Sequence, residues 1–422
     1  MAQDAHDRTT TSRTNTPGTA PVEGQQELSQ NVNGAPKHPL NTAEKQDSEL
    51  LNKFGVVRHS ENGVVQYKLA GSSGDSTLFE ASASAGEFVQ SEHKLETMIQ
   101  SKIQDLKTHY HVDFSVEGEN AVRPYVSETK RGAMLYARAP RYSELLGVEA
   151  ALKASEPSQF TDEKNKEALK FYFLKTPTFG AKTYDAALFA GDEKKKLAVF
   201  FEPDAQPGRP ITATDALNLH QDIKTSIEAL AGHEIAHNSE YQMGLWSLDK
   251  LKPIAENIGW TTTEDNSYWL MRGARGEFYR LTNDGLSSDK GWVRCDSKGT
   301  ATDDLGVSYA DAEKAPHLTN SEVRERALLR PPTDYFTSPD EMLADSLMLY
   351  RVGEGGKQEL SKSGVNLYNA VKDFDQAEID ARFGKTVDGV SKKVRLPDGS
   401  LVDNDERAQQ VVANFTKTLL LV

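Results

Sequence analysis

The chain has 422 residues, of which 37% are hydrophobic, a formal net charge of −14 and a single cysteine, Cys295. This composition suits a soluble protein with one large or two ordinary cores, and the acidic balance argues against nucleic acid or an anionic membrane as the main partner, because both bind basic patches. One cysteine excludes an intrachain disulfide and a cysteine-based zinc site, and no apolar run is long enough to span a membrane.

Residues 1–48 differ from the rest of the chain. They are rich in Thr, Ser, Asn, Gln, Gly and Pro and contain almost no large apolar residues, a composition typical of disorder. The first residues lack the basic and apolar regions of a secretory signal. We therefore expect a disordered tail and a protein that is cytoplasmic in the producing cell. The tail is either a solubilising extension or a segment for export by a leaderless, specialised route.

Residues 49–90 contain two β-prone runs and Gly- and Ser-rich stretches, which predict a short hairpin and a linker. The apolar spacing of the following residues alternates between helical and strand-like. It predicts a helix near 95–106, a strand over 112–116, a helix near 145–152 and a hairpin formed by 186–189 and 197–201. This order leads directly into the most informative motif of the chain.

That motif is His233-Glu234-Ile235-Ala236-His237. Apolar residues at intervals of three and four around it predict a helix, on which the two histidines project from one face. Two imidazole nitrogens can then share one Zn²⁺, with Glu234 beside the metal as general base for an attacking water molecule. The alternative is a surface helix with scattered polar residues, in which the motif is a coincidence.

A third zinc ligand must come from elsewhere in the chain. No H-x-x-G-x-x-H extension follows His237, and Glu240 is a poor candidate because one straight helix rarely surrounds an ion. Ser338-Pro339 predicts the start of a second helix. On this helix, Glu341 and Asp345 share one face. Glu341 is the candidate for the third ligand, and Asp345 is the candidate to accept a hydrogen bond from the free N–H of a ligand histidine. Ser338 and Glu341 also fit a capping box, which leaves Asp345 unexplained.

Residues 245–330 separate the two motifs and are predicted to form an insertion. Its first part is helix-like up to Ile258, with an interruption at Pro253, and three short β runs between 268 and 294 predict a β-meander. The aromatic residues of the meander either pack the small sheet or line a substrate subsite. Residues 363–422 are predicted to add a C-terminal extension with a helix over 363–384 and a hairpin.

The two motifs resemble the catalytic domain of anthrax-lethal-factor-type metallopeptidases, which belong to the gluzincins. The resemblance rests on H-E-x-x-H followed by Tyr335 and by Glu341-x-x-Ala344-Asp345. It implies zinc ligands at His233, His237 and Glu341, a general base at Glu234, an oxyanion-stabilising phenol at Tyr335 and an orienting carboxylate at Asp345. Tyr335 stands six residues before Glu341, where the family usually has seven, and the 104-residue gap between the motifs is longer than the family norm.

We therefore expect an α+β, gluzincin-like (zincin) catalytic domain over residues 91–362, with a small mixed sheet whose edge strand lies above the cleft. The expected function is that of a monomeric, zinc-dependent endopeptidase that binds a protein or peptide substrate in an extended conformation, as a secreted bacterial effector or toxin does. The alternative is a catalytically silent zinc-binding protein that acts by interaction or inhibition. The intact Glu234 argues against that alternative.

Overall fold

The computed structural model describes residues 45–46, 50, 53–61, 64–69, 77–82, 87–121, 135–155, 160–162, 167–174, 186–192, 195–202, 223–282, 291–333 and 336–419. Apart from residues 45–46, the tail expected to be disordered lies outside these ranges. Helices and sheets alternate through the described chain, in agreement with the α+β class. Among the described helices, none has the length and apolar character needed to cross a membrane.

An antiparallel sheet of three strands opens the described chain. Its strands are β1 (Val56–Glu61), β2 (Val64–Leu69) and β3 (Thr77–Ser82). The first two form the expected hairpin, but β3 occupies a stretch for which the sequence indicates a linker. The third strand forms because Phe79 stacks on Tyr67, with ring centroids 4.6 Å apart, and Leu78 packs against the core. A short apolar run between Gly/Ser-rich segments is enough to form a strand when a neighbouring strand offers hydrogen-bond partners.

A mixed sheet with the strand order β10–β11–β9–β4 follows. Its members are β4 (Asp113–Phe114), β9 (Lys170–Phe173), β10 (Ala186–Asp192) and β11 (Lys195–Glu202). Strand β9 is parallel to both of its neighbours, whereas β10 is antiparallel to β11, so the predicted hairpin closes one end of the sheet among the described strands. Two small hairpins accompany the sheet: β5 (Asn120–Ala121) with β6 (Leu135–Tyr136), and β7 (Thr161–Asp162) with β8 (Glu167–Ala168).

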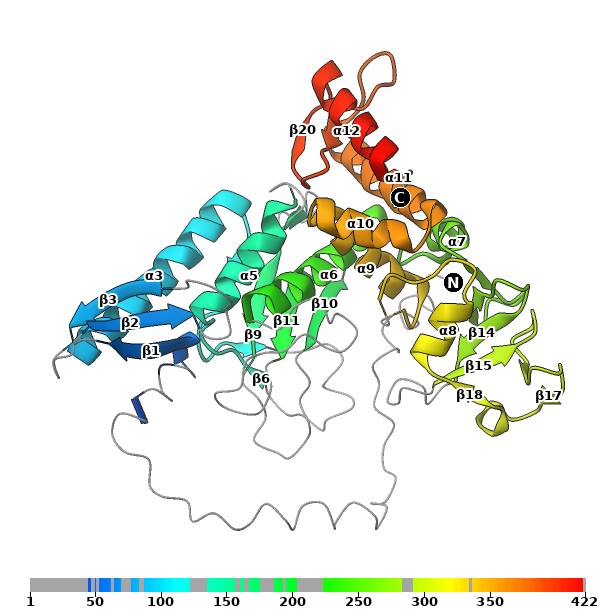
Figure 1. Ribbon diagram of the computed structural model, residues 1–422, viewed down its shortest axis with the longest axis horizontal. Helices are drawn as coiled ribbons and strands as arrows, with labels where there is room; N and C mark the ends of the chain where they lie inside the picture. Colours follow the sequence, from blue (N-terminus) through cyan, green and yellow to red (C-terminus); the bar gives the residue numbers. More distant parts are fainter. Residues whose placement is uncertain are drawn as a thin grey trace, which may run out of the picture.

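Three helices pack beside these sheets: α3 (Glu87–Tyr110), α5 (Tyr142–Lys153) and α6 (Ile223–Met243). Helix α5 contacts both of the others, and α6 also contacts β10, β11 and α9 (Pro339–Arg351). Figure 1 shows the three helices side by side, with β9, β10 and β11 below them in that view. The order of helix, strand, hairpin and long helix is the one expected ahead of the histidine motif.

The segment between α6 and α9 forms the predicted β-meander. It begins with α7 (Leu248–Asn257), which continues through Pro253 because Leu251 and Ala255 on either side are buried in the core; the expected interruption is therefore wrong. The strands that follow pair antiparallel. They are β12 (Trp260–Thr262), β13 (Trp269–Arg272), β14 (Phe278–Leu281), β15 (Trp292–Cys295), β16 (Ala301–Thr302), β17 (Ser308–Tyr309) and β18 (His317–Leu318), and α8 (Asn320–Arg326) ends the segment.

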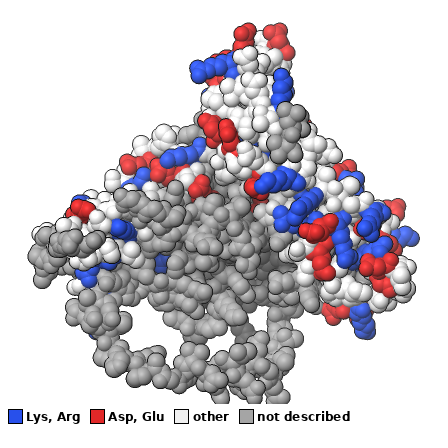
Figure 2. Space-filling view, viewed as in Figure 1, with Lys and Arg blue, Asp and Glu red and all other residues white. Residues whose placement is uncertain are grey.

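Two buried tryptophans of this sheet pack against the start of α9. Trp260 donates from Nε1 to the Met342 sulfur at 3.3 Å, and the Trp292 ring stacks on Phe336 with centroids 5.3 Å apart. Both indoles are essentially inaccessible to solvent, so for this pair the packing interpretation is confirmed over the substrate-subsite interpretation. On the outer surface of the insertion, acidic and basic side chains are intermingled (Figure 2).

The C-terminal extension predicted over 363–422 contains α11 (Val365–Phe383), β19 (Lys393–Arg395), β20 (Leu401–Asp403) and α12 (Glu406–Leu419), and α10 (Glu354–Lys362) leads into it from the end of the predicted catalytic domain. The predicted helix over 363–384 and the predicted hairpin are confirmed, and α10 and α12 add to them. Helix α11 contacts α7, α9 and α10. The extension therefore packs directly on the helices that surround the two motifs, although α12 projects from the body (Figure 1).

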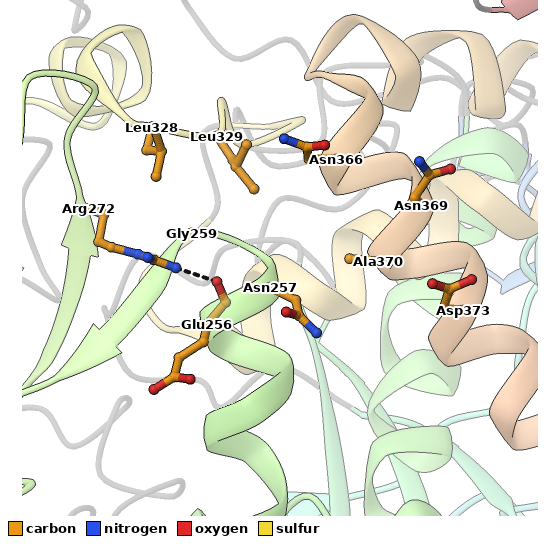
Figure 3. A pocket seen from close by; sticks show the side chains of 10 residues that line it. All are labelled: Glu256, Asn257, Gly259, Arg272, Leu328, Leu329, Asn366, Asn369, Ala370 and Asp373. Carbon is orange, nitrogen blue, oxygen red and sulfur yellow. Dashed lines mark hydrogen bonds between the residues drawn. The ribbon is translucent and has the colours of Figure 1, made fainter.

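A hollow of about 540 Å³ lies where α11 meets α7 and β13 (Figure 3). Its lining is mostly polar and includes Asn257, Asn366, Asn369 and Asp373. The Arg272 guanidinium reaches across its edge and donates to the carbonyl oxygen of Glu256. None of the residues that the sequence predicts as site residues lines this hollow.

Buried ion pairs join the extension to the rest of the fold. Asp375 on α11 accepts hydrogen bonds from Arg351 Nε (2.8 Å) on α9 and from Arg395 Nε (2.7 Å) on β19. Arg395 also donates to the carbonyl oxygens of Ala154, at the end of α5, and of Gly399. Burial alone raises the pKa of Asp375, but the two arginines outweigh it and lower the pKa to about 2.

We expect Asp375 to make the fold sensitive to acid. Its pKa is depressed on folding, so its contribution to stability is complete above the ordinary pKa near 3.8 and is lost as the pH falls through about 2. The loss amounts to about 2 kcal/mol. Urea unfolding between pH 5 and pH 2 should therefore show a shallower decline for Asp375→Asn than for the wild type. Identical slopes would contradict the assignment.

Candidate metal centre

Helix α6 carries the predicted histidine motif and presents it to the core. Ile227, Leu230 and Ile235 are buried on this helix, as the apolar spacing predicts. The rings of His233 and His237 meet edge to face, with centroids 4.7 Å apart. Both histidines therefore lie on one face of the helix, which is the arrangement expected from their spacing.

Helix α9 crosses α6 closely enough to bring Glu341 to the histidines. At the crossing, Gly232 faces Met348, and a Cβ atom at position 232 would lie only 2.8 Å from the Met348 Cγ atom. The absence of a side chain at Gly232 thus permits the close approach. Ser338 is the N-cap of α9, but its side chain makes no capping hydrogen bond, so Glu341 is not part of a capping box.

Three donor atoms from the two helices converge on one point. His233 Nε2 lies 3.0 Å from Glu341 Oε2 and 3.1 Å from His237 Nε2, and the distance between His237 Nε2 and Glu341 Oε2 is 3.3 Å. The three side chains are mostly buried. Groups of this kind can hold a metal ion, and within the described part of the chain His233, His237 and Glu341 form such a group.

Each histidine turns its other ring nitrogen to a carboxylate. His233 Nδ1 donates to Asp345 Oδ1 at 2.6 Å, and His237 Nδ1 donates to Glu240 Oε2 at 2.8 Å. Asp345 is itself held by a hydrogen bond from the Thr333 hydroxyl. A carboxylate on Nδ1 fixes the ring orientation and leaves Nε2 as the lone-pair donor, which is the usual support of a metal-binding histidine.

The electrostatics of the cluster favour a positive charge at its centre. Burial alone lowers the pKa of His233, but the Asp345 and Glu341 carboxylates outweigh it and raise the pKa to about 10. Burial alone raises the pKa of Glu341, but the two histidines hold it well below its ordinary range. The carboxylates thus stabilise positive charge at the histidines. A bound metal cation would supply this positive charge in place of protons on the imidazoles.

Glu234 stands next to the cluster on the same helix. Its side chain is only 2% exposed, and no described residue donates a hydrogen bond to its carboxylate. Tyr335, the predicted oxyanion donor, lies outside the described residues.

The structure adds three features that the sequence did not indicate. Glu240 orients His237 instead of competing as a ligand, Gly232 permits the helix crossing, and Thr333 holds Asp345. The role of Glu240 could have been found in the sequence, because its position three residues after His237 places both on one face of the helix.

No family model, no curated protein and no solved structure matches this chain.

Proposed function

We propose that the protein is a zinc-dependent endopeptidase with a gluzincin-type active site. The observation that carries the proposal is the convergence of His233 Nε2, His237 Nε2 and Glu341 Oε2 from two helices, with Glu234 beside them. Two histidines and one glutamate are a donor set that catalytic zinc sites use, with a fourth position left for water or substrate.

The spacing of the donor atoms agrees with tetrahedral zinc. Bonds of about 2.0–2.1 Å at tetrahedral angles separate neighbouring donors by about 3.3 Å. The distances in the cluster are 3.0, 3.1 and 3.3 Å. Zinc held there supplies a Lewis acid that polarises a substrate carbonyl and makes water more acidic.

The chain's own residues account for the proton transfers. Glu234 takes a proton from the attacking water molecule and passes it to the leaving amine, the general acid–base role that a carboxylate at this position of the motif performs. Asp345 and Glu240 keep the two imidazoles in the tautomer that leaves Nε2 unprotonated. From the sequence resemblance, Tyr335 is the donor to the oxyanion that develops during attack.

An extended peptide is the substrate form that the fold favours. Strand β10 is the end strand of the described mixed sheet, runs antiparallel to β11 and contacts the histidine helix α6. We propose that the outer edge of β10 pairs with the backbone of a peptide and so presents a scissile bond to the cluster. Backbone pairing of this kind places main-chain rather than side-chain groups, which suits a protein substrate.

The direct test is cleavage of an unbiased peptide library by the purified protein, with and without a chelator. We expect internal cleavage of library members, its loss after the chelator, and its return when Zn²⁺ is restored. Cleavage that resists the chelator would contradict the zinc mechanism. A protein that binds zinc but cleaves no member of the library would favour the catalytically silent alternative.

A further inference from the structure

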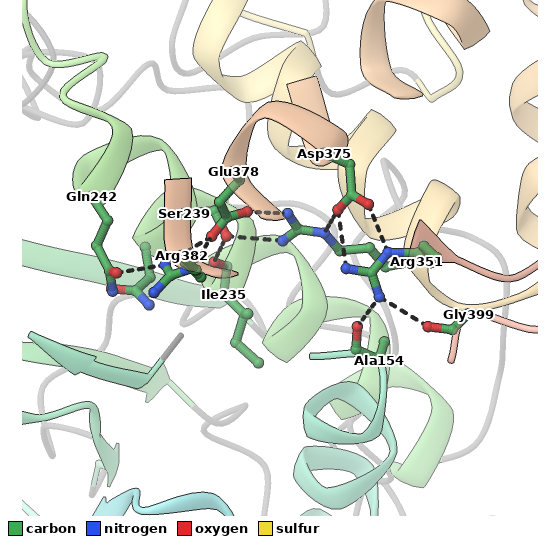
Figure 4. Close-up of polar contacts among 11 residues, drawn as sticks. Ala154, Ile235, Ser239, Gln242, Arg351, Asp375, Glu378, Arg382 and Gly399 are labelled. Atoms are coloured by element: carbon green, nitrogen blue, oxygen red, sulfur yellow. Dashed lines mark hydrogen bonds and ion pairs between the residues drawn. The ribbon is translucent and has the colours of Figure 1, made fainter. Parts of the chain in front are cut away.

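Arg351, at the end of the helix that carries Glu341, also reaches the helix that carries the histidines. Its Nη1 atom donates to Ser239 Oγ at 2.9 Å, and Ser239 lies two residues after His237 on α6. Figure 4 shows this guanidinium between the helices, with Ser239 on one side and Asp375 on the other. The two metal-ligand helices are thus joined by a polar contact that lies outside the donor cluster.

The guanidinium is held in place by α11. Arg351 Nε donates to Asp375 Oδ1 at 2.8 Å, and Nη2 donates to Glu378 Oε2 at 2.5 Å. All three side chains are almost fully buried. Since the planar guanidinium has three of its donors fixed in three directions, its position is defined far more narrowly than that of an apolar side chain.

A second contact joins α11 to α6 on the same side. Glu378 also accepts from Arg382 Nη2 at 2.8 Å, and the same nitrogen donates to Gln242 Oε1 at 2.5 Å (Figure 4). The carboxylate of Glu378 therefore organises two arginines, each of which reaches α6. One of these arginines belongs to α9 and the other to α11, so the three helices share one polar cluster.

Such a cluster is poorly explained by stability alone. Buried ion pairs can often be replaced by apolar side chains of similar volume without loss of stability, and in some proteins their benefit is a defined geometry. A metal site needs that benefit here, because its donors come from two helices and their distances must hold to a fraction of an ångström.

We propose that Arg351 is a positioning residue of the metal centre. Held by Asp375 and Glu378, it fixes α6 against α9 through Ser239, so that helix α11 of the C-terminal extension sets the affinity of a site to which it contributes no ligand. The inference rests on the proposed metal site, but not on peptidase activity.

Two serine variants test it without removing a buried charge, since loss of Arg351 itself would leave two carboxylates unpaired. Ser239→Ala deletes the hydroxyl that accepts from Arg351. Ser346→Ala is the matched control, because Ser346 is equally buried on α9 and its hydroxyl donates within its own helix, to the Met342 carbonyl at 2.7 Å. The Zn²⁺ dissociation constant, measured by competition with a chelating indicator, and the melting temperature are recorded for both.

We expect Ser239→Ala to weaken Zn²⁺ binding by about tenfold, as loss of groups that orient metal ligands does. Ser346→Ala should bind Zn²⁺ like the wild type, and its melting temperature should fall less than that of Ser239→Ala, which leaves a buried N–H of Arg351 without its acceptor. Equal Zn²⁺ affinity in the two variants would overturn the role of Arg351 while leaving the metal site intact. A wild-type protein that binds no Zn²⁺ would overturn the metal site, and the inference with it.

Discussion

Glu234→Gln is expected to keep about one zinc per chain and to reduce peptide cleavage by about 10²- to 10⁴-fold, the range that general acid–base catalysis contributes. The amide matches the carboxylate in size but cannot accept a proton from water. Metal binding should survive, because the donor atoms come from His233, His237 and Glu341 and not from Glu234. The measurements are zinc content by elemental analysis and kcat/KM on a peptide obtained from the library.

Glu228→Gln serves as the control for this variant. It makes the same chemical change on the same helix, but position 228 lies outside the donor cluster. Normal cleavage by this control shows that an amide on α6 is tolerated. Undiminished cleavage by Glu234→Gln would mean that another group activates the water, or that the activity comes from a contaminant.

The helices and strands whose apolar residues recur at a regular spacing could be predicted from the sequence. Helix α6, the hairpin of β10 and β11, and the meander strands β13, β14 and β15 all follow apolar residues at helical or alternating spacing. Strand β3 and the continuation of helix α7 through Pro253 could not be predicted in this way. Both depend on neighbours distant in sequence: Tyr67 stacks on Phe79 in one case, and the core holds Leu251 and Ala255 in the other.

The candidate metal centre also has a part that the sequence predicts and a part that it does not. The four-residue spacing of His233 and His237, and that of Glu341 and Asp345, place each pair on one helix face, so their convergence could be anticipated from two short motifs. The contacts that hold the two helices together could not. Gly232 and Arg351 acquire their roles only from how α6 crosses α9, and no local pattern records the angle or the depth of a helix crossing.

Glu341→Ala is expected to remove most of the zinc from the purified protein. The variant keeps both histidines but loses the single charged ligand, so its Zn²⁺ affinity should fall by more than about a hundredfold, the upper range for groups that merely orient ligands. Zinc content after dialysis and the Zn²⁺ dissociation constant measure the effect. Glu354→Ala, the same change at an exposed position of α10, should retain wild-type zinc.

Full zinc retention in Glu341→Ala would contradict the ligand assignment and would require another acidic group to complete the site. Glu240 is the nearest alternative in sequence, but its carboxylate lies on Nδ1 of His237, 2.8 Å away, whereas the donor cluster is formed by the Nε2 atoms. To serve as a ligand, Glu240 would have to leave that hydrogen bond and release the ring it orients. Loss of zinc in Glu341→Ala together with an intact fold would therefore identify α9 as the source of the third ligand.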